Sequence, residues 1–190
     1  MKNKHKIILT VLGLLLVFVM SLHAGEPLKI YNSGNWGFKI PFGRNYDYAN
    51  ILVRRVVDGD TLVLENGERV RLIGIDTPEM HESNKLDRDS QRSGEDKRVI
   101  QELGRRAYIF TRNLVEGKRV SLEFDLERQD QYERLLAYVY LKDLNHTFVN
   151  AEIVKEGYAS LMTIPPNVKY ADLFSRLYQE ARANRRGLWK

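Results

Sequence analysis

The residues best suited to chemistry are carboxylates that the sequence places at the ends of predicted strands. Asp58 and Asp60 lie in one turn, and Asp76 and Glu79 follow a later strand. In a barrel built from hairpins these two junctions can lie side by side, where converging carboxylates repel each other unless a cation or a proton lies between them. A hard divalent ion, which takes carboxylate, carbonyl and water oxygens, is the natural occupant. The pattern therefore favours a hard metal site.

Two arginines accompany these carboxylates. Arg71 lies on the strand that leads into Asp76, and Arg134 stands at the start of the fifth predicted strand. A guanidinium presents a rigid fork of donors that matches two phosphate oxygens. Hydrolysis of a phosphodiester needs a cation that polarises the phosphoryl group, arginines that stabilise the transition state and a carboxylate that orients or deprotonates water. Singly, Asp-Gly-Asp is a common turn and an arginine a surface ion pair, so the interpretation depends on the complete set.

Composition limits the class of protein that could carry this site. The 190 residues are 43% hydrophobic and 29% charged, which suits one soluble globular domain and excludes a collagen-like, wholly disordered or multi-span membrane chain. There is no cysteine, which excludes a disulfide framework, a thiolate zinc site, an iron–sulfur cluster and a cysteine nucleophile. Beyond residue 24 the histidines are His81 and His146, too few to favour a zinc-type site.

Residues 1–24 have the order of a secretory signal peptide. Lys2, Lys4 and Lys6 precede the apolar run 7–22, and small residues follow near a plausible cleavage point. The run is shorter than the about 20 residues of a spanning helix, so we expect cleavage, with an uncleaved anchor as the competing interpretation. The remainder is then secreted, or lies in the periplasm or cell envelope. The three lysines supply three of the five net charges, so the remainder, at +2, argues only weakly for a polyanionic partner.

Hydrophobic periodicity predicts the elements that position the site. Residues 25–49 are expected to be an irregular lead-in, and residues 50–190 the domain. Alternation predicts five strands, over 51–57, 61–64, 69–75, 119–124 and 136–141, with an Asn-Gly hairpin turn at 66–67. Apolar spacing predicts helices over 100–115, 149–156 and 170–184, and the charged stretch 79–104 is expected to be a solvated loop. The fold class predicted is mainly β with α (α+β): a five-stranded OB-fold Greek-key barrel with about three helices.

Several separated blocks of the chain resemble the thermonuclease (staphylococcal nuclease) family, in order and with compatible spacing from about Asn50 to Trp189. The blocks are residues 57–61, 71–79, 130–140, 149–150, 157–159 and 187–189. The resemblance implies an OB-fold barrel with helices and a calcium-dependent nuclease that acts on DNA and RNA. It also implies cleavage between phosphorus and the 5′ oxygen, which leaves 3′-phosphate ends.

The resemblance assigns the expected metal ligands by position. Asp60 and Asp76 would bind calcium through their side chains, and Thr77 through its backbone carbonyl. Asp58 matches an acidic neighbour of the metal. The cofactor implied is therefore Ca²⁺.

The resemblance assigns the reacting and substrate-binding side chains in the same way. Arg71 and Arg134 match two phosphate-binding arginines, and Glu79 matches the carboxylate near the attacking water. Tyr132 matches a tyrosine beside a nucleotide phosphate. The expected partner is DNA, RNA or both; no obligate protein partner is predicted, and membrane contact is expected only transiently, through the signal segment.

Three departures from the family pattern concern substrate binding. Gln131 stands where a lysine usually precedes the tyrosine, and the tyrosines that flank the base are absent from 159–166. The stretch 80–103 is longer than the corresponding family loop. Its basic residues could track a nucleic-acid backbone, with a solvated loop as the alternative.

A second function class fits the same fold. A non-catalytic OB-fold module could bind nucleic acid or protein without cleaving it, because one barrel can host many tasks. Such a module usually loses the catalytic carboxylates or arginines, and none is lost here. The sequence therefore favours a metal-dependent phosphodiesterase over a binding module.

Overall fold

The computed structural model describes residues 47–190, which form a closed barrel with helices around it. The predicted signal segment 1–24 and the lead-in up to residue 46 lie outside the described residues. Within 47–190, no helix has the length and apolar content needed to cross a membrane.

Five strands close the barrel in the order β1-β2-β3-β6-β5. Their bounds are β1 Ile51–Asp58, β2 Thr61–Leu64, β3 Arg69–Leu72, β5 Arg119–Glu123 and β6 Leu135–Leu141. Neighbouring strands are antiparallel except β3 and β6, which run parallel, and β1 closes the ring on β5. The hairpin between β2 and β3 has Gly67 at φ 88°, a conformation that glycine adopts without strain. The predicted α+β fold with a five-stranded OB-type barrel is confirmed.

The segment that was expected to be one strand over 69–75 is broken in two. β3 ends at Leu72, and β4 (Gly74–Asp76) pairs with β7 (Ser160–Met162) in a separate two-stranded sheet. Gly74 has φ 83°, and a Cβ there would lie 2.5 Å from the ring of Phe174, so this position needs glycine for both conformation and space. The break carries Asp76 out of the barrel wall and onto the second sheet.

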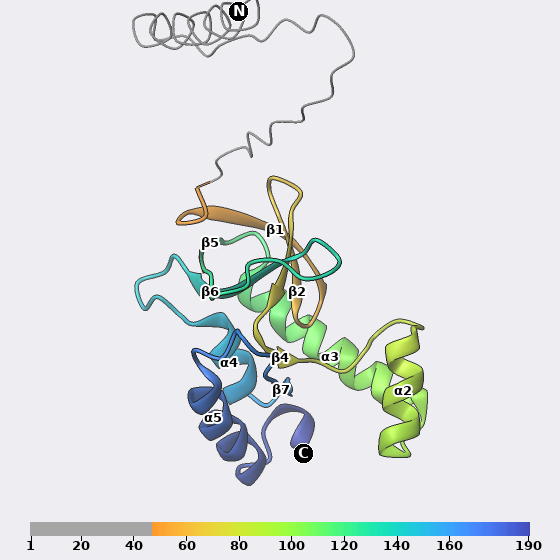
Figure 1. The fold of residues 1–190 in the computed structure, drawn as a ribbon. Helices are drawn as coiled ribbons and strands as arrows, with labels where there is room; N and C mark the ends of the chain where they lie inside the picture. Colours follow the sequence, from red (N-terminus) through yellow and green to blue (C-terminus); the bar gives the residue numbers. More distant parts are fainter. Residues whose placement is uncertain (1–46) are drawn as a thin grey trace, which may run out of the picture. The chain divides into compact units, whose positions relative to one another are not determined.

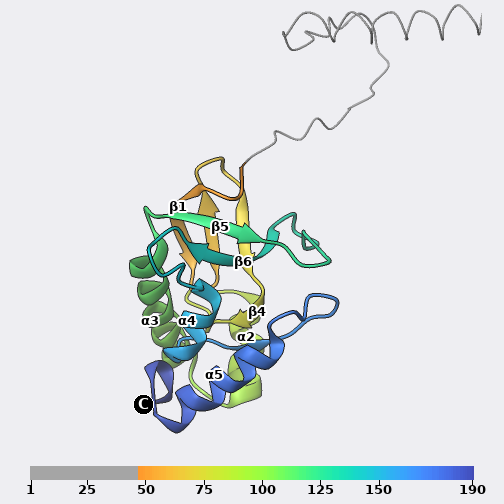
Figure 2. The same ribbon diagram turned by 90° about the vertical axis from the view of Figure 1, so that its left-hand side faces the viewer.

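The three predicted helices are present as α3 (Lys97–Val115), α4 (Val149–Lys155) and α5 (Ala171–Ala183). The chain ends in a short 3-10 turn, η1 (Gly187–Trp189). α4 and α5 lie together at one end of the barrel, and α3 runs along another side (Figures 1 and 2). The largest fully buried side chains include Leu62 and Leu72 from the barrel, Tyr138 from β6 and Phe174 from α5, so one core joins barrel and helices.

The prediction of a solvated loop over 79–104 is wrong for much of its length. Residues Asn84–Ser93 form the helix α2, and α3 begins at Lys97. α2 has almost no apolar face; only Leu86 is buried. Its ends are specified instead: the Ser83 hydroxyl accepts a hydrogen bond from Leu86 N, and Gly94 closes the helix at φ 74°. The capping contacts at its two ends therefore explain why this stretch is helical, although its hydropathy predicted a loop.

Candidate active site

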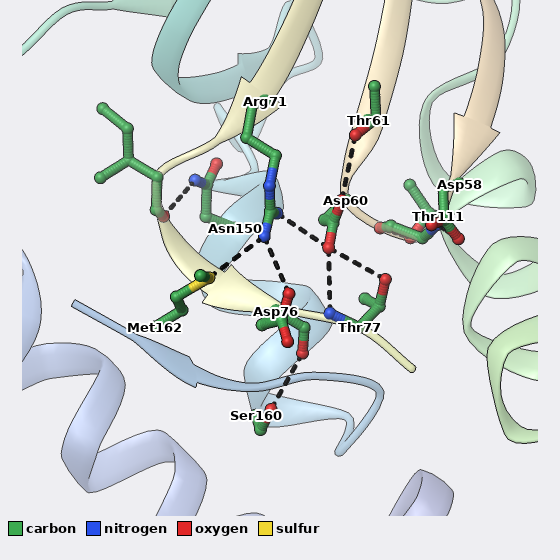
Figure 3. Close-up of polar contacts among 12 residues, drawn as sticks. Asp58, Asp60, Thr61, Arg71, Asp76, Thr77, Thr111, Asn150, Ser160 and Met162 are labelled. Carbon is green, nitrogen blue, oxygen red and sulfur yellow. Dashed lines mark hydrogen bonds and ion pairs between the residues drawn. The ribbon is translucent and has the colours of Figure 1, made fainter. Parts of the chain in front are cut away.

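Asp60 joins the two acidic junctions. Its side chain is buried, and Oδ2 accepts hydrogen bonds from both the backbone nitrogen and the hydroxyl of Thr77, each at 3.0 Å. Oδ1 accepts a third bond, from the Thr61 hydroxyl at 3.0 Å (Figure 3). Burial alone would raise the pKa of Asp60, but Arg71 and the bond from Thr77 outweigh it and lower that pKa. The Asp60 carboxylate, directly before β2, is thus kept ionised and lies against Thr77, the residue directly after β4.

Arg71 lies between the carboxylates of Asp60 and Asp76. Nη1 lies 2.8 Å from Asp60 Oδ2, an ion pair without hydrogen-bond geometry, and Nη2 donates to Asp76 Oδ1 at 2.9 Å (Figure 3). Asp76 is placed in turn by the hydroxyl of Ser160 on β7, which donates to its backbone carbonyl. The two junctions therefore converge on one guanidinium, although they leave the barrel on different strands.

Lys85 is a member of this group that the sequence did not single out. It lies in the first turn of α2, and its Nζ donates to the Thr77 carbonyl at 2.7 Å and lies 3.1 Å from Asp76 Oδ1. Burial would lower its pKa, but the charges of Asp76 and Asp60 raise it, so the ammonium stays protonated. The signal that could have found it was the Ser83 cap, which predicts a helix start beside the second acidic junction.

Asp58 and Glu79 are also close to one another. Burial, the charge of Asp60 and the charge of Glu79 raise the pKa of Asp58 to about 7, although Gly59 N donates a hydrogen bond of 2.7 Å to its carboxylate. Such a shift is expected where carboxylates are gathered without enough positive charge. The described contacts of Glu79 include no arginine or lysine; its Oε1 accepts a long bond, 3.5 Å, from His81 N.

Helix α3 supports both acidic junctions from behind. The buried Thr111 hydroxyl donates to the Gly59 carbonyl at 2.7 Å and so fixes the turn between Asp58 and Asp60. About two turns earlier, Gly104 packs directly on the chain before His81: a Cβ there would lie 2.7 Å from Pro78 O. These contacts hold the loops that carry the carboxylates against a rigid helix. The apolar periodicity of this helix predicted core packing and not this supporting role.

Arg134 lines a pocket of about 360 Å³ that Arg71 lines as well. Its Nε donates to Asp130 Oδ2 at 2.7 Å, and its guanidinium carbon lies 5.6 Å from the ring centre of Tyr132, which is 70% exposed. The pocket is lined by residues from three parts of the chain: Arg71, Ile73, Gly74, Glu127, Asp130, Gln131, Tyr132, Arg134, Leu136, Met162, Ile164 and Asn167. Arg71 and Arg134 thus face one cavity, whereas Asp58 and Glu79 do not line it.

Part of the apolar lining of this pocket comes from the 159–166 stretch, where the family's flanking tyrosines are absent. Met162 and Ile164 are 42% and 57% exposed and line the pocket. The sulfur of Met162 also lies 3.5 Å from Arg71 Nη2 (Figure 3). Aliphatic and thioether groups, rather than aromatic rings, are therefore available to contact a ligand on this side.

The donor set fits a hard cation. Asp60, Asp76 and the Thr77 carbonyl offer only oxygen. Within residues 47–190 no group of three or more His, Cys, Asp or Glu side chains is placed to hold a metal ion, so an ion here would depend on these two carboxylates, the carbonyl and water. Burial raises the pKa of the neighbouring Asp58, and the charges of Asp60 and Glu79 add to this effect, so further carboxylates lie around the site. Two carboxylates and a carbonyl suit a calcium-type ion with waters completing its shell.

A closed OB-type barrel with carboxylates at its strand ends and two arginines in an adjoining pocket defines an OB-fold protein suited to an anionic ligand. The family described as "Staphylococcal nuclease homologue" matches residues 69–190, so the chain belongs to this family. The matched range includes every candidate site residue except Asp58 and Asp60.

Comparison with individual proteins agrees with this membership. A thermonuclease of Staphylococcus intermedius is 38% identical over 142 residues, which cover 73% of this chain and 75% of that protein. A thermonuclease of Staphylococcus hyicus is 31% identical over 140 residues, covering 72% and 73%. The endonuclease YncB of Bacillus subtilis is 33% identical over 165 residues, covering 84% and 71%. Each alignment extends well beyond a single motif.

Proposed function

We propose that the protein is an exported, calcium-dependent nuclease that hydrolyses DNA, RNA or both by cleaving the P–O5′ bond and leaving 3′-phosphate ends. Family membership and relatives named thermonuclease and endonuclease support the nuclease class. The observation that carries the proposal is the pocket shared by Arg71 and Arg134, with the carboxylates of Asp60 and Asp76 directly behind Arg71.

The arginines bind and position the phosphodiester. A guanidinium has five N–H donors, and Arg71 directs two nitrogens at carboxylates, so donors remain for a phosphate in the pocket. Asp130 holds Arg134 by its Nε, which leaves the terminal nitrogens free to form the fork that matches two phosphate oxygens. Both groups are oriented before substrate arrives, which is the condition for electrostatic stabilisation of a developing charge.

Asp60, Asp76 and the Thr77 carbonyl would hold the calcium ion. When bound, the ion supplies a Lewis acid that polarises the phosphoryl oxygen. The chain's own contribution is rigidity: Thr61 and Thr77 fix the Asp60 carboxylate, and Ser160 fixes the backbone of Asp76. Ligands held in this way lose little freedom on binding an ion.

Glu79 is the proposed general base or water-orienting carboxylate. Its backbone is pressed against Gly104 of α3, while no arginine or lysine pairs with its side chain among the described contacts. A carboxylate without a cationic partner keeps its lone pairs available to accept a proton from water. Glu79 lies outside the arginine pocket, on the side of Asp58, so water and phosphate would be held by different groups.

Export is proposed from residues 1–24 alone, whose basic start, apolar run and small residues are typical of a signal peptide. The mass of the protein recovered from the medium or envelope distinguishes cleavage after the signal from an uncleaved anchor. Membrane contact would then be transient, and no obligate protein partner is proposed.

The proposal is tested by incubating the full chain with single-stranded DNA and with RNA, in calcium and then in EGTA. We expect cleavage with calcium, its loss in EGTA, and products whose 3′ ends lose phosphate on phosphatase treatment. Comparing linear with circular DNA separates cutting within chains from cutting at ends.

Arg134→Ala should lower kcat by about a thousandfold, because it removes a fixed donor of transition-state charge stabilisation. Arg105→Ala is the matched control, since Arg105 is 54% exposed and pairs with Glu102 on the surface of α3. Binding without cleavage under all conditions would instead identify a non-catalytic OB-fold module. Full activity of Arg134→Ala would show that the pocket is not the site of reaction.

A further inference from the structure

Lys85 contacts two of the three groups proposed as calcium ligands. Its ammonium donates to the Thr77 carbonyl at 2.7 Å and lies 3.1 Å from the Asp76 carboxylate. It therefore takes up two of the oxygens that a hard cation would use at this site. An ammonium and a calcium ion share a preference for such oxygens, and both carry positive charge, so they cannot occupy them together.

We propose that Lys85 competes with calcium for this position and so sets the affinity of the site for the ion, an inference that rests on the proposed function. In the metal-free protein the ammonium offsets the repulsion among the gathered carboxylates. When a divalent ion binds, the ammonium must move away from Thr77 and Asp76. Lys85 is thus a residue that determines metal affinity, not a ligand.

The surroundings of Lys85 allow this exchange without unfolding α2. Lysine carries its charge on a flexible four-carbon stem, and the side chain is 27% exposed, so the ammonium can turn towards water. The helix is anchored by other contacts: Leu86 is fully buried, Ser83 caps its first turn, and Asp87 pairs with Lys97 of α3. The stretch that departs most in length from the family thus places one cation into the proposed metal site.

We do not expect lysine and calcium to exchange at Asp60 as they do at Asp76. Its Oδ2 already accepts two bonds from Thr77 and faces Arg71, and its Oδ1 accepts from Thr61. Asp76 has fewer protein donors, with Arg71 and Lys85 both at Oδ1. The exchange between lysine and metal is therefore expected at Asp76 and the Thr77 carbonyl.

The test is calorimetric titration of calcium into the full chain after removal of metal by EGTA and dialysis, at fixed ionic strength. Lys85→Met keeps the length of the stem and removes the charge; Lys85→Gln keeps a donor for the Thr77 carbonyl without charge. Both should bind calcium about tenfold more tightly than the wild type, because the lost pair is partly buried and lies between exposed and buried ion pairs in strength. Lys155→Met, which removes a lysine that is 44% exposed and pairs with Glu152 on α4, is the control and should leave Kd unchanged.

The outcomes separate this inference from the proposed function. If the wild type binds calcium and both Lys85 variants bind it equally or more weakly, the competition is refuted while the calcium site stands. If the Lys85 variants bind calcium and the wild type does not, the competition is supported in its strongest form. If no protein binds calcium, the metal site and this inference fail together. Circular dichroism in EGTA confirms that each variant is folded before titration.

Discussion

Replacing Asp58 with asparagine should stabilise the metal-free protein, and more so at alkaline pH. Asp58 is held beside Asp60 and Glu79, and burial together with those charges raises its pKa from 3.8 to about 7. Below pH 3.8 both the folded and the unfolded chain hold the proton, and the group adds no pH dependence. Between pH 3.8 and 7 the folded protein keeps a proton that the unfolded chain has lost, so stability falls as pH rises. Above pH 7 the penalty is constant.

The size of this effect follows from the same shift. Each pKa unit corresponds to about 1.4 kcal/mol, so the full penalty above pH 7 is on the order of 4 kcal/mol. Most of this penalty develops between pH 5 and pH 7, where the unfolded chain has lost the Asp58 proton and the folded protein still holds it. The stabilisation of Asp58→Asn relative to the wild type should therefore increase by about 3 kcal/mol between pH 5 and pH 8. Asparagine retains an oxygen that can accept the hydrogen bond from Gly59 N.

The assay is urea unfolding of both proteins at pH 5 and pH 8 in EGTA, followed by circular dichroism. Only the difference between variant and wild type is interpreted, because other groups titrate in both proteins. Asp172→Asn, an exposed position in the first turn of α5, controls for the exchange of aspartate for asparagine itself. A difference that is the same at both pH values, or that shrinks towards pH 8, would refute the reasoning that Asp58 is ionised there at the expense of stability.

Three further predictions concern the support and chemistry of the site. Thr111→Val should lower the free energy of unfolding by about 1–3 kcal/mol because it leaves the buried Gly59 carbonyl unpaired, whereas Thr111→Ser should not; urea unfolding distinguishes them. Gly104→Ala should destabilise by about 1–3 kcal/mol and lower kcat, because its methyl would press on Pro78 and displace Glu79; melting temperature and turnover measure both effects. Glu79→Gln should lower kcat by about a hundredfold or more while calorimetry shows calcium binding retained, and loss of binding would make Glu79 a ligand instead.

Local sequence patterns predicted most of the framework. The Asn-Gly turn before Glu68 and the alternation around it gave the β2–β3 hairpin its position, and apolar spacing located α3, α4 and α5 within a few residues. These elements are predictable because a turn and a buried helix face each depend on residues that lie close together in the sequence. The types and order of the candidate site residues were equally visible, since most of the carboxylates lie at strand ends, Arg71 lies within a strand and Arg134 directly precedes one.

Two features, the helix α2 and the break at Gly74, were not predicted because their causes produce no periodic pattern in the sequence. α2 buries only Leu86, and its order comes from Ser83 and Gly94 at its ends, which a hydropathy pattern does not weigh. The break at Gly74 lies in a stretch that alternates like a strand. What decides it is the ring of Phe174, which leaves no space for a Cβ at that point.

By itself, the sequence determined which chemical groups exist and which elements carry them: hard carboxylate oxygens, guanidinium forks and a barrel to hold them. The tertiary structure decided which groups meet. It placed Arg71 between Asp60 and Asp76, brought Lys85 to the Thr77 carbonyl, and buried Asp58 near other carboxylates, which raises its pKa. Burial and charge–charge interactions depend on distances between segments far apart in the chain, and those distances exist only after the barrel has closed.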